Sequence, residues 1–152
     1  MRLIHDCSRP YGKGVNSYAT TTPFSYQTVD DALRLLPQNG YLAKIDLRNA
    51  YRVVPVHPRC YQATGLQWLF QGNKKPTFLF DTRLPFGAAR SPQIFNRLSK
   101  AVTRMMKRRG YLVIAYMDDF LVIADNKIDC VNGFNVLLDL FENLVLKSTL
   151  TR

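Results

Sequence analysis

The sequence predicts an α+β fold in which an antiparallel sheet has helices packed on one face. Two observations carry this prediction. Short β-branched runs at 111–115 and 120–124 flank a polar turn, as in a hairpin, and two longer segments place apolar residues at helical spacing. The 152 residues suit one domain with a hydrophobic core, and a composition that is 47% hydrophobic excludes a disordered chain.

The first third of the chain predicts a loop, a short helix and a strand. Residues 7–27 are rich in Ser, Thr, Gly, Pro and Tyr, which is typical of a surface loop. Thr28 is expected to begin a short helix, because Asp31 follows three residues later as in a capping box, and residues 37–40 end it. A strand is then expected over residues 41–47.

The middle of the chain predicts a hairpin. Its strands are expected around residues 63–70 and 77–83, since both runs are apolar and β-prone. Residues 71–76 between them combine Gly, Asn and Pro, which supply the chemistry of a turn.

The segment from Ser91 to Gly110 predicts the clearest helix. Ser91 suits the N-cap, Pro92 the first helical position, and Gly110 the position just past the end. One face is apolar, and the other is a basic stripe made of Arg97, Lys100, Arg104, Lys107 and Arg108. A solvated face is the ordinary explanation of the stripe, and contact with phosphates is the alternative. A last amphipathic helix is expected over the apolar positions from Val131 to Val145.

Charge and cysteine content narrow the class of partner. The chain has 21 Lys and Arg against 11 Asp and Glu, a net charge of +10 that favours a polyanion, with nucleic acid ahead of an acidic membrane surface. The three cysteines form no CxxC pair, so we expect reduced thiols in an intracellular compartment, cytoplasmic or nuclear. No apolar stretch reaches the ~20 residues of a membrane span, so no membrane partner is expected.

Three acidic residues are the candidates for chemistry. Asp46 ends the first strand, and Asp118 with Asp119 occupies the tip of the hairpin. If those strands are neighbours, the carboxylates converge at one edge and suit Mg²⁺, and two such ions can drive an in-line displacement. The alternative is structural, because adjacent aspartates also occupy turns for the hydrogen bonds they make to their own backbone. Spacing alone leaves both explanations open.

Four segments resemble, in order, the motifs of reverse transcriptases. Residues 116–119 (Tyr-Met-Asp-Asp) resemble the catalytic hairpin of that family, and residues 44–51 resemble its first palm motif. Residues 84–87 (Leu-Pro-Phe-Gly) resemble the motif beside template and nucleotide, and residues 2–6 the end of a fingers strand. The resemblance covers residues 1–125, and the Phe of Leu-Pro-Phe-Gly points to retrotransposon enzymes.

The resemblance implies an RNA-directed DNA polymerase that uses two Mg²⁺ ions, with Mn²⁺ as a possible substitute. Asp46 and Asp118 would bridge the metals, and Asp119 would be a more peripheral ligand. The resemblance also implies a polymerase palm fold with partial fingers. Fingers-like parts would lie at about residues 1–40 and 60–83, and palm parts at about 41–59 and 84–152.

The same resemblance implies a nucleotide site. Asn49 and Ala50 would offer backbone N–H groups to the triphosphate, which Arg2 would also contact. Tyr51 would stack under the incoming sugar and exclude a 2′-hydroxyl, and Phe86 would line the nucleotide pocket. A packed core aromatic remains the alternative for Tyr51 and for Phe86.

Primer and template contacts are implied at Tyr116, Met117, Gly87, Ser91 and Pro92. Met117 would lie against the primer end, and a gap-filling core methionine is its alternative. The partners implied are a primed RNA or DNA template, dNTPs, and the remaining portion of a larger polyprotein. Thumb and ribonuclease H regions are absent from this sequence, and Lys147 is the candidate for a loop lysine near the phosphates.

These implications leave three functions open. The first is a fingers–palm fragment of a retroelement polymerase. It would be weak or inactive alone, because it lacks the thumb that clamps the duplex. The second is a non-catalytic nucleic-acid-binding remnant that uses the basic stripe. The third is an RNA-templated RNA polymerase, against which Tyr51 and residues 84–87 argue.

Overall fold

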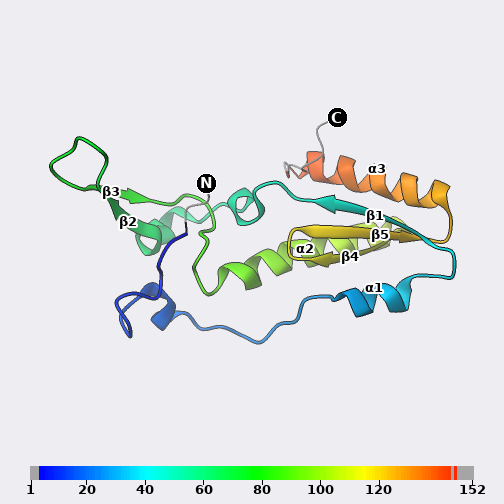
Figure 1. Cartoon of the computed structure of the whole chain (residues 1–152), viewed down its shortest axis with the longest axis horizontal. Coiled ribbons are helices and arrows are strands. Elements are labelled where there is room, and N and C mark those ends of the chain that lie inside the picture. The colour runs from blue at the N-terminus through cyan, green and yellow to red at the C-terminus, as the bar shows by residue number, and fades with distance from the viewer. Residues whose placement is uncertain (1–3, 145, 147–152) are drawn as a thin grey trace. The chain divides into compact units, whose positions relative to one another are not determined.

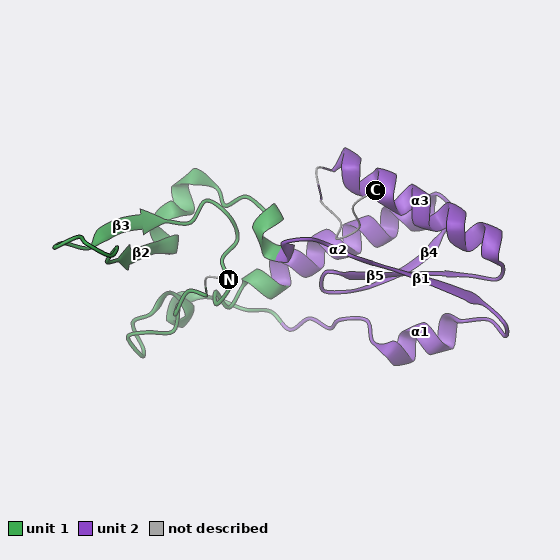
Figure 2. Ribbon diagram, turned by 45° about the horizontal axis from the view of Figure 1, so that its top comes forward, with its two compact units in different colours: residues 1–22, 51–92 green, residues 23–50, 93–152 purple. Residues whose placement is uncertain are grey.

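The computed structural model describes residues 4–144 and 146, and the chain divides into two compact units (Figure 2). Unit 1 consists of Met1–Thr22 and Tyr51–Pro92, and unit 2 of Pro23–Ala50 and Gln93–Arg152. The chain therefore passes twice through each unit. These boundaries differ from those expected for fingers and palm, and the assignment of those two names stays a prediction. None of the helices in the described part is long and apolar enough to cross a membrane.

Unit 2 is built on an antiparallel sheet with the strand order β1-β5-β4 (Figure 1). The strands are β1 (Tyr41–Asp46), β4 (Leu112–Tyr116) and β5 (Asp119–Ala124). The helix α3 (Lys127–Asn143) packs on one face, where the Phe120 and Phe141 rings meet edge-on at 5.1 Å between centroids. Both rings are buried. The predicted α+β class, the first strand and the second hairpin are confirmed.

A second, shorter helix covers the other face of the sheet. This helix is α1 (Val29–Leu35), and Ala32 packs with Ile114 and Ile123. The predicted capping box is confirmed, because the Asp31 N–H donates to Thr28 Oγ1 at 3.3 Å and the Thr28 N–H donates to the Asp31 carboxylate at 2.8 Å. The sheet thus has helices on both faces. The predicted helix-covered face is the one under α3, and the cover that α1 provides on the other face was not predicted.

The long helix α2 (Ser91–Arg108) confirms the clearest prediction. Its core face includes Phe95, Val102 and Met106, each at most 1% exposed. Gly110, at φ 84°, follows its end as expected. One detail differs, because Ser91 is the first residue of the helix rather than its N-cap, and its hydroxyl donates to the Pro85 carbonyl at 2.6 Å.

Unit 1 contains a two-stranded antiparallel hairpin, β2 (Gly65–Trp68) and β3 (Thr77–Phe80). Three short 3₁₀ helices accompany it along the chain: η1 (Val15–Tyr18), η2 (Ala50–Val53) and η3 (Pro58–Thr64). Both strands are shorter than predicted. The first starts later because η3 takes up residues 63 and 64, and the second ends before Asp81.

A buried carboxylate joins three segments of unit 1. Asp81 is 6% exposed and accepts a short hydrogen bond from Arg52 and one of 3.1 Å from the Arg83 N–H. His5 Nε2 lies 3.3 Å from the same carboxylate. Burial raises the Asp81 pKa, but the Arg52 and Arg83 hydrogen bonds and the charges of Arg52 and His5 outweigh it, so the pKa lies below its usual value. His5 therefore has a structural role in unit 1.

We expect Asp81→Asn to lower the free energy of unfolding by about 1–3 kcal/mol at pH 7, because it leaves buried donors with a weaker acceptor. A carboxyl with a depressed pKa stabilises the fold fully above the unfolded pKa of ~3.9, and that contribution is lost as the pH falls through the folded pKa. The gap between the two proteins should therefore begin to narrow below about pH 4 and close as the pH falls through the folded pKa. Urea unfolding at pH 7 and pH 3 measures it, with Asp125→Asn, an exposed site, as control. Equal losses in both variants would contradict the role of Asp81.

Candidate functional site

The three candidate aspartates all belong to unit 2. Asp46 at the end of β1 is the register partner of Asp119 at the start of β5. Residues directly opposed in an antiparallel pair point to the same face, so these two carboxylates share one face of the sheet. Asp118 lies in the two-residue loop between β4 and β5. Opposed like charges destabilise a strand pair, so a cation beside these two acids would stabilise the pairing.

The loop that carries Asp118 is fixed through its backbone carbonyls. The Ser99 hydroxyl of α2 donates to the Met117 carbonyl at 2.8 Å, and the Leu47 N–H donates to the Asp118 carbonyl at 2.9 Å. Met117 has φ 55°, a conformation found in tight hairpin turns but unfavourable for a non-glycine residue. The hairpin tip is therefore held from two sides in a strained conformation.

Lys44 supplies the cation beside the paired acids. Its Nζ lies 2.9 Å from Asp119 Oδ1, and both side chains are partly exposed. Lys44 precedes Asp46 by two residues on β1, so both side chains lie on the same face. The hydrogen bond and charge of Asp119 raise the Lys44 pKa, and the charges of Asp46 and Asp118 act in the same direction. All three carboxylates therefore act electrostatically on one ammonium group.

The residues fit a metal by type and register, but their side chains are not gathered. Carboxylate oxygens are hard ligands of the kind that Mg²⁺ takes. Within residues 4–144 and 146, however, no three Asp, Glu, His or Cys side chains are grouped closely enough to hold one ion. Asp119 is instead engaged by Lys44. The backbone positions of Asp46 and Asp119 thus agree with the expected convergence at one edge of the sheet. The three carboxylates, however, do not form a cluster in the described part of the chain.

The residues expected at a nucleotide pocket fall in both units. Tyr51 and Phe86, in unit 1, contact each other with ring centroids 4.9 Å apart. Tyr51 is buried and Phe86 half-buried. Asn49 and Ala50 end the first segment of unit 2 at φ 70° and 37°, in the left-handed region that Asn tolerates and Ala rarely adopts. Arg2 lies outside the described residues, as does Lys147.

The Leu84–Gly87 loop approaches the N-terminal segment closely. The His5 N–H donates to the Phe86 carbonyl at 2.9 Å. Gly87 has φ 101°, and a Cβ at this position would lie 2.0 Å from the His5 carbonyl oxygen. Glycine is therefore required at Gly87 both by its backbone conformation and by its neighbour.

Asn16 completes the support of this loop. Its amide nitrogen donates to the Gly87 carbonyl at 3.0 Å, and its amide oxygen accepts from the Ala89 N–H at 2.7 Å. The Ser91 hydroxyl holds the Pro85 carbonyl, and Pro92 follows as the second residue of α2. Asn16, Ser99 and Lys44 are positioning residues that sequence reasoning missed.

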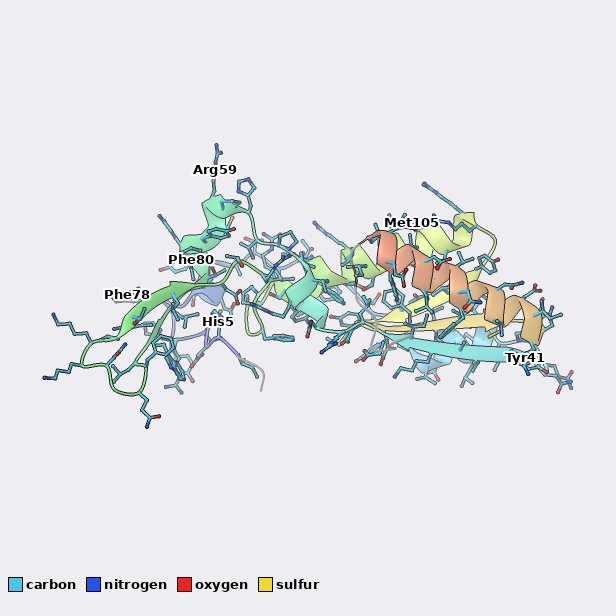
Figure 3. The ribbon with its side chains drawn as sticks, turned by 90° about the horizontal axis from the view of Figure 1, so that it is seen from above. His5, Tyr41, Arg59, Phe78, Phe80 and Met105 are labelled. Atoms are coloured by element: carbon cyan, nitrogen blue, oxygen red, sulfur yellow. The ribbon has the colours of Figure 1, made fainter. Side chains whose placement is uncertain are left out.

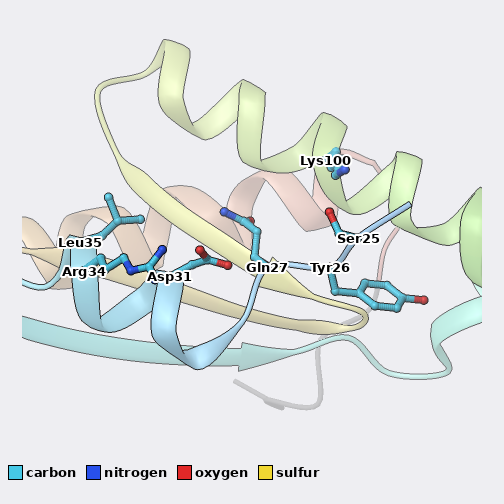
Figure 4. A pocket seen from close by; sticks show the side chains of 7 residues that line it. All are labelled: Ser25, Tyr26, Gln27, Asp31, Arg34, Leu35 and Lys100. Carbon is cyan, nitrogen blue, oxygen red and sulfur yellow. The ribbon is translucent and has the colours of Figure 1, made fainter. Parts of the chain in front are cut away.

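Tyr116 extends the site into an aromatic cluster of unit 2. It is 53% exposed, and its ring lies 5.3 Å from that of Tyr26, which meets Phe24 edge-on at 5.1 Å. Tyr26 borders a polar pocket of about 340 Å³ whose lining includes Asp31, Arg34 and Lys100 (Figure 4). A second pocket of about 520 Å³ is mainly apolar and is lined by α1, Lys44, Tyr116 and Asp119.

Most of the chain matches reverse transcriptases and the polyproteins that contain them. Residues 6–150 match the family described as reverse transcriptase (RNA-dependent DNA polymerase). The Gag-Pol polyprotein of avian reticuloendotheliosis virus is 27% identical over 143 residues, and that of koala retrovirus is 27% identical over 132. These matches cover 90% and 86% of this chain but 12% and 8% of the polyproteins.

A solved structure confirms the fold class. The crystal structure of a prototype foamy virus protease–reverse transcriptase, a selenomethionine-labelled CSH mutant, matches with a TM-score of 0.69 and 22% identity. The match covers 90% of this chain and 17% of that chain. The present chain therefore spans a small part of the proteins that it resembles.

We expect Gly87→Ala to be more destabilising than Gly72→Ala. Both glycines have positive φ, but a Cβ at Gly72 meets nothing within 4 Å, whereas at Gly87 it meets the His5 carbonyl. Backbone strain should cost each variant ~1–3 kcal/mol, and the steric clash should cost Gly87→Ala about 1–3 kcal/mol more. Chemical denaturation measures both variants, and equal losses would show that the close approach is unimportant.

We expect Lys44→Met to lower the melting temperature of the metal-free protein at low salt, because the repulsion between Asp46 and Asp119 then lacks its counter-charge. At about 1 M salt, where screening acts over ~3 Å, the difference from wild type should shrink. Thermal melts at two salt concentrations measure this. Lys74→Met, which removes an exposed loop cation, is the control. A loss that does not depend on salt would contradict the electrostatic explanation.

Proposed function

The chain belongs to the reverse transcriptase (RNA-dependent DNA polymerase) family, and we propose that it is the fingers–palm portion of a retroelement polymerase. The reaction proposed is transfer of a deoxynucleotide from a dNTP to the 3′-hydroxyl of a primer on an RNA or DNA template. The observation that carries this proposal is the register pairing of Asp46 with Asp119. Asp118 precedes Asp119 in a loop whose backbone carbonyls are held by hydrogen bonds.

We propose that the three carboxylates hold two divalent ions, Mg²⁺ or Mn²⁺. Asp46 and Asp118 would bridge the ions, and Asp119 would be the peripheral ligand once it leaves Lys44. When bound, the ions would activate the attacking hydroxyl and neutralise the departing pyrophosphate. The chain's own contribution is to hold opposed acids in register, which the buried Ile45 and Phe120 support.

The resemblance assigns nucleotide contacts to residues that follow β1 in unit 2 and to Tyr51 and Phe86 in unit 1. Tyr51 would lie under the sugar and exclude a 2′-hydroxyl, with Phe86 beside it. The contact between their rings supports this role. Asn49 and Ala50 would present N–H groups to the triphosphate, and their left-handed backbone supports a functional explanation for the strain. Arg2 is the proposed further contact to the triphosphate.

Primer and template would contact Tyr116, Met117, Gly87, Ser91 and Pro92. The exposure of Tyr116 and the basic stripe on α2 support contact with a polyanion. We further propose that the chain is part of a larger polyprotein that supplies a thumb and ribonuclease H. The Phe86 of Leu-Pro-Phe-Gly supports a retrotransposon origin, while the viral polyproteins that match share the same domain.

One observation favours a second function, a nucleic-acid-binding remnant without catalysis. Lys44 engages Asp119, and the described residues hold no three-ligand cluster. Such a remnant would keep salt-dependent binding to primer–template but would incorporate no nucleotide.

Primer extension with Mg²⁺ or Mn²⁺ separates the two functions. A weak polymerase should add a few nucleotides, and Asp118→Asn should lower the yield by at least about 100-fold, as loss of a transition-state charge contact does. Mn²⁺ binding, followed by electron paramagnetic resonance, should weaken in the same variant. Asp125→Asn, also an acid of unit 2, is the control. Wild-type binding of primer–template without any incorporation would favour the remnant.

A further inference from the structure

One face of the β2–β3 hairpin carries aromatic side chains that the fold of unit 1 leaves exposed. Phe78 and Phe80 are two residues apart on β3 and share a face, and they are 80% and 57% exposed. Tyr61, on η3, stacks on Phe80 with centroids 4.9 Å apart and planes at 19°. Tyr61, Phe80 and Phe78 thus form a continuous row, which we call the aromatic row. Figure 3 labels Phe78 and Phe80 on β3.

The strand opposite leaves the aromatic row open. Phe80 faces Gly65, which has no side chain to cover the ring, and Phe78 faces Gln67. A shallow pocket of about 480 Å³ lies over this face and is lined by the aromatic row with Gly65 and Gln67 among others. A phenylalanine that is 80% exposed contributes little to folding, so the row suits contact with a partner.

Charge identifies the kind of partner. Unit 1 has nine Lys and Arg residues but only Asp6 and Asp81 as acids, so it holds +7 of the chain's net charge of +10. Asp81 is buried against Arg52 and so contributes no exposed negative charge. Exposed cations lie at both ends of the row, with Arg59 on η3 and Lys74 and Lys75 in the loop between β2 and β3.

We propose that the aromatic row binds single-stranded nucleic acid, with bases stacked on Phe78, Phe80 and Tyr61 and phosphates bound by the flanking cations. Aromatic rings bind unpaired bases of any sequence because every base has a π-face, whereas the faces of paired bases are already stacked within a duplex. Residues two apart on a strand are separated by about 7 Å, which suits an extended strand. A second copy of the chain fits less well, since it would place two strongly basic units together.

This site is separate from the carboxylates, because it uses unit 1 residues alone while the three aspartates belong to unit 2. It does not rest on polymerase activity.

The test is titration of the full chain with a fluorescent oligothymidylate of about 10 nucleotides, within the range of known single-strand sites, in the absence of divalent ions. Phe78→Ala should weaken binding at least 10-fold. Phe78→Tyr should retain most of the affinity, and Phe78→Leu should lose it, because stacking needs a ring. Tyr18→Ala, which removes another exposed aromatic of unit 1, is the matched control and should bind as wild type.

Salt dependence tests the cations. Lys74→Ala combined with Lys75→Ala should lower the slope of log affinity against log salt by about 1.4, at ~0.7 per phosphate contact. An unlabelled duplex of the same length should compete poorly for the wild-type site.

Several results would overturn the proposal. Unchanged affinity in Phe78→Ala, or equal losses in Phe78→Ala and Phe78→Tyr, would exclude stacking. Sedimentation that shows a dimer lost in Phe78→Ala, without a change in oligonucleotide affinity, would make the row an interface between copies. Circular dichroism checks that each variant folds. Asp118 belongs to unit 2, so Asp118→Asn should bind the oligonucleotide normally. Oligonucleotide binding by the wild-type chain without any primer extension would count against the proposed function alone.

Discussion

The opposition of Asp46 and Asp119 across two paired strands is the constraint on which the rest of unit 2 depends. Their neighbours Ile45 and Phe120 are fully buried on the opposite face of the sheet. A slip of one residue would turn those side chains outward, so hydrophobic burial fixes the register and holds like charges together. The protein offsets the resulting repulsion with Lys44, which the same alternation places on the acidic face.

Support of the candidate site comes largely from main-chain carbonyls. Ser99 and Leu47 hold the loop of Met117 and Asp118, and in unit 1 Asn16 and His5 hold the Leu84–Gly87 loop. These hydrogen bonds act on the backbone of each loop and do not use the side chains of the loop residues. The backbone contacts therefore position each loop, and contact with a ligand is left to its side chains.

Patterns among neighbouring residues in the sequence predicted most of the helices and strands of the fold. The residues that were missed make contacts between segments far apart in the sequence. The Thr28 capping box, the α2 helix and the Asp118 hairpin follow from neighbours in sequence, and all are present. Ser99, Asn16 and the partner of Lys44 act across 18 or more residues, so no short pattern contains them. Ser99 had a weak signal, since it is a polar residue on the apolar face of α2. The first strand of the predicted middle hairpin started too early because η3 takes up residues 63 and 64.

The backbone of Met117 has an evolutionary consequence. At φ 55° a glycine would relieve strain, so selection for stability alone would replace the methionine. The residue that occupies the turn beside the paired acids is therefore not the one that folds best.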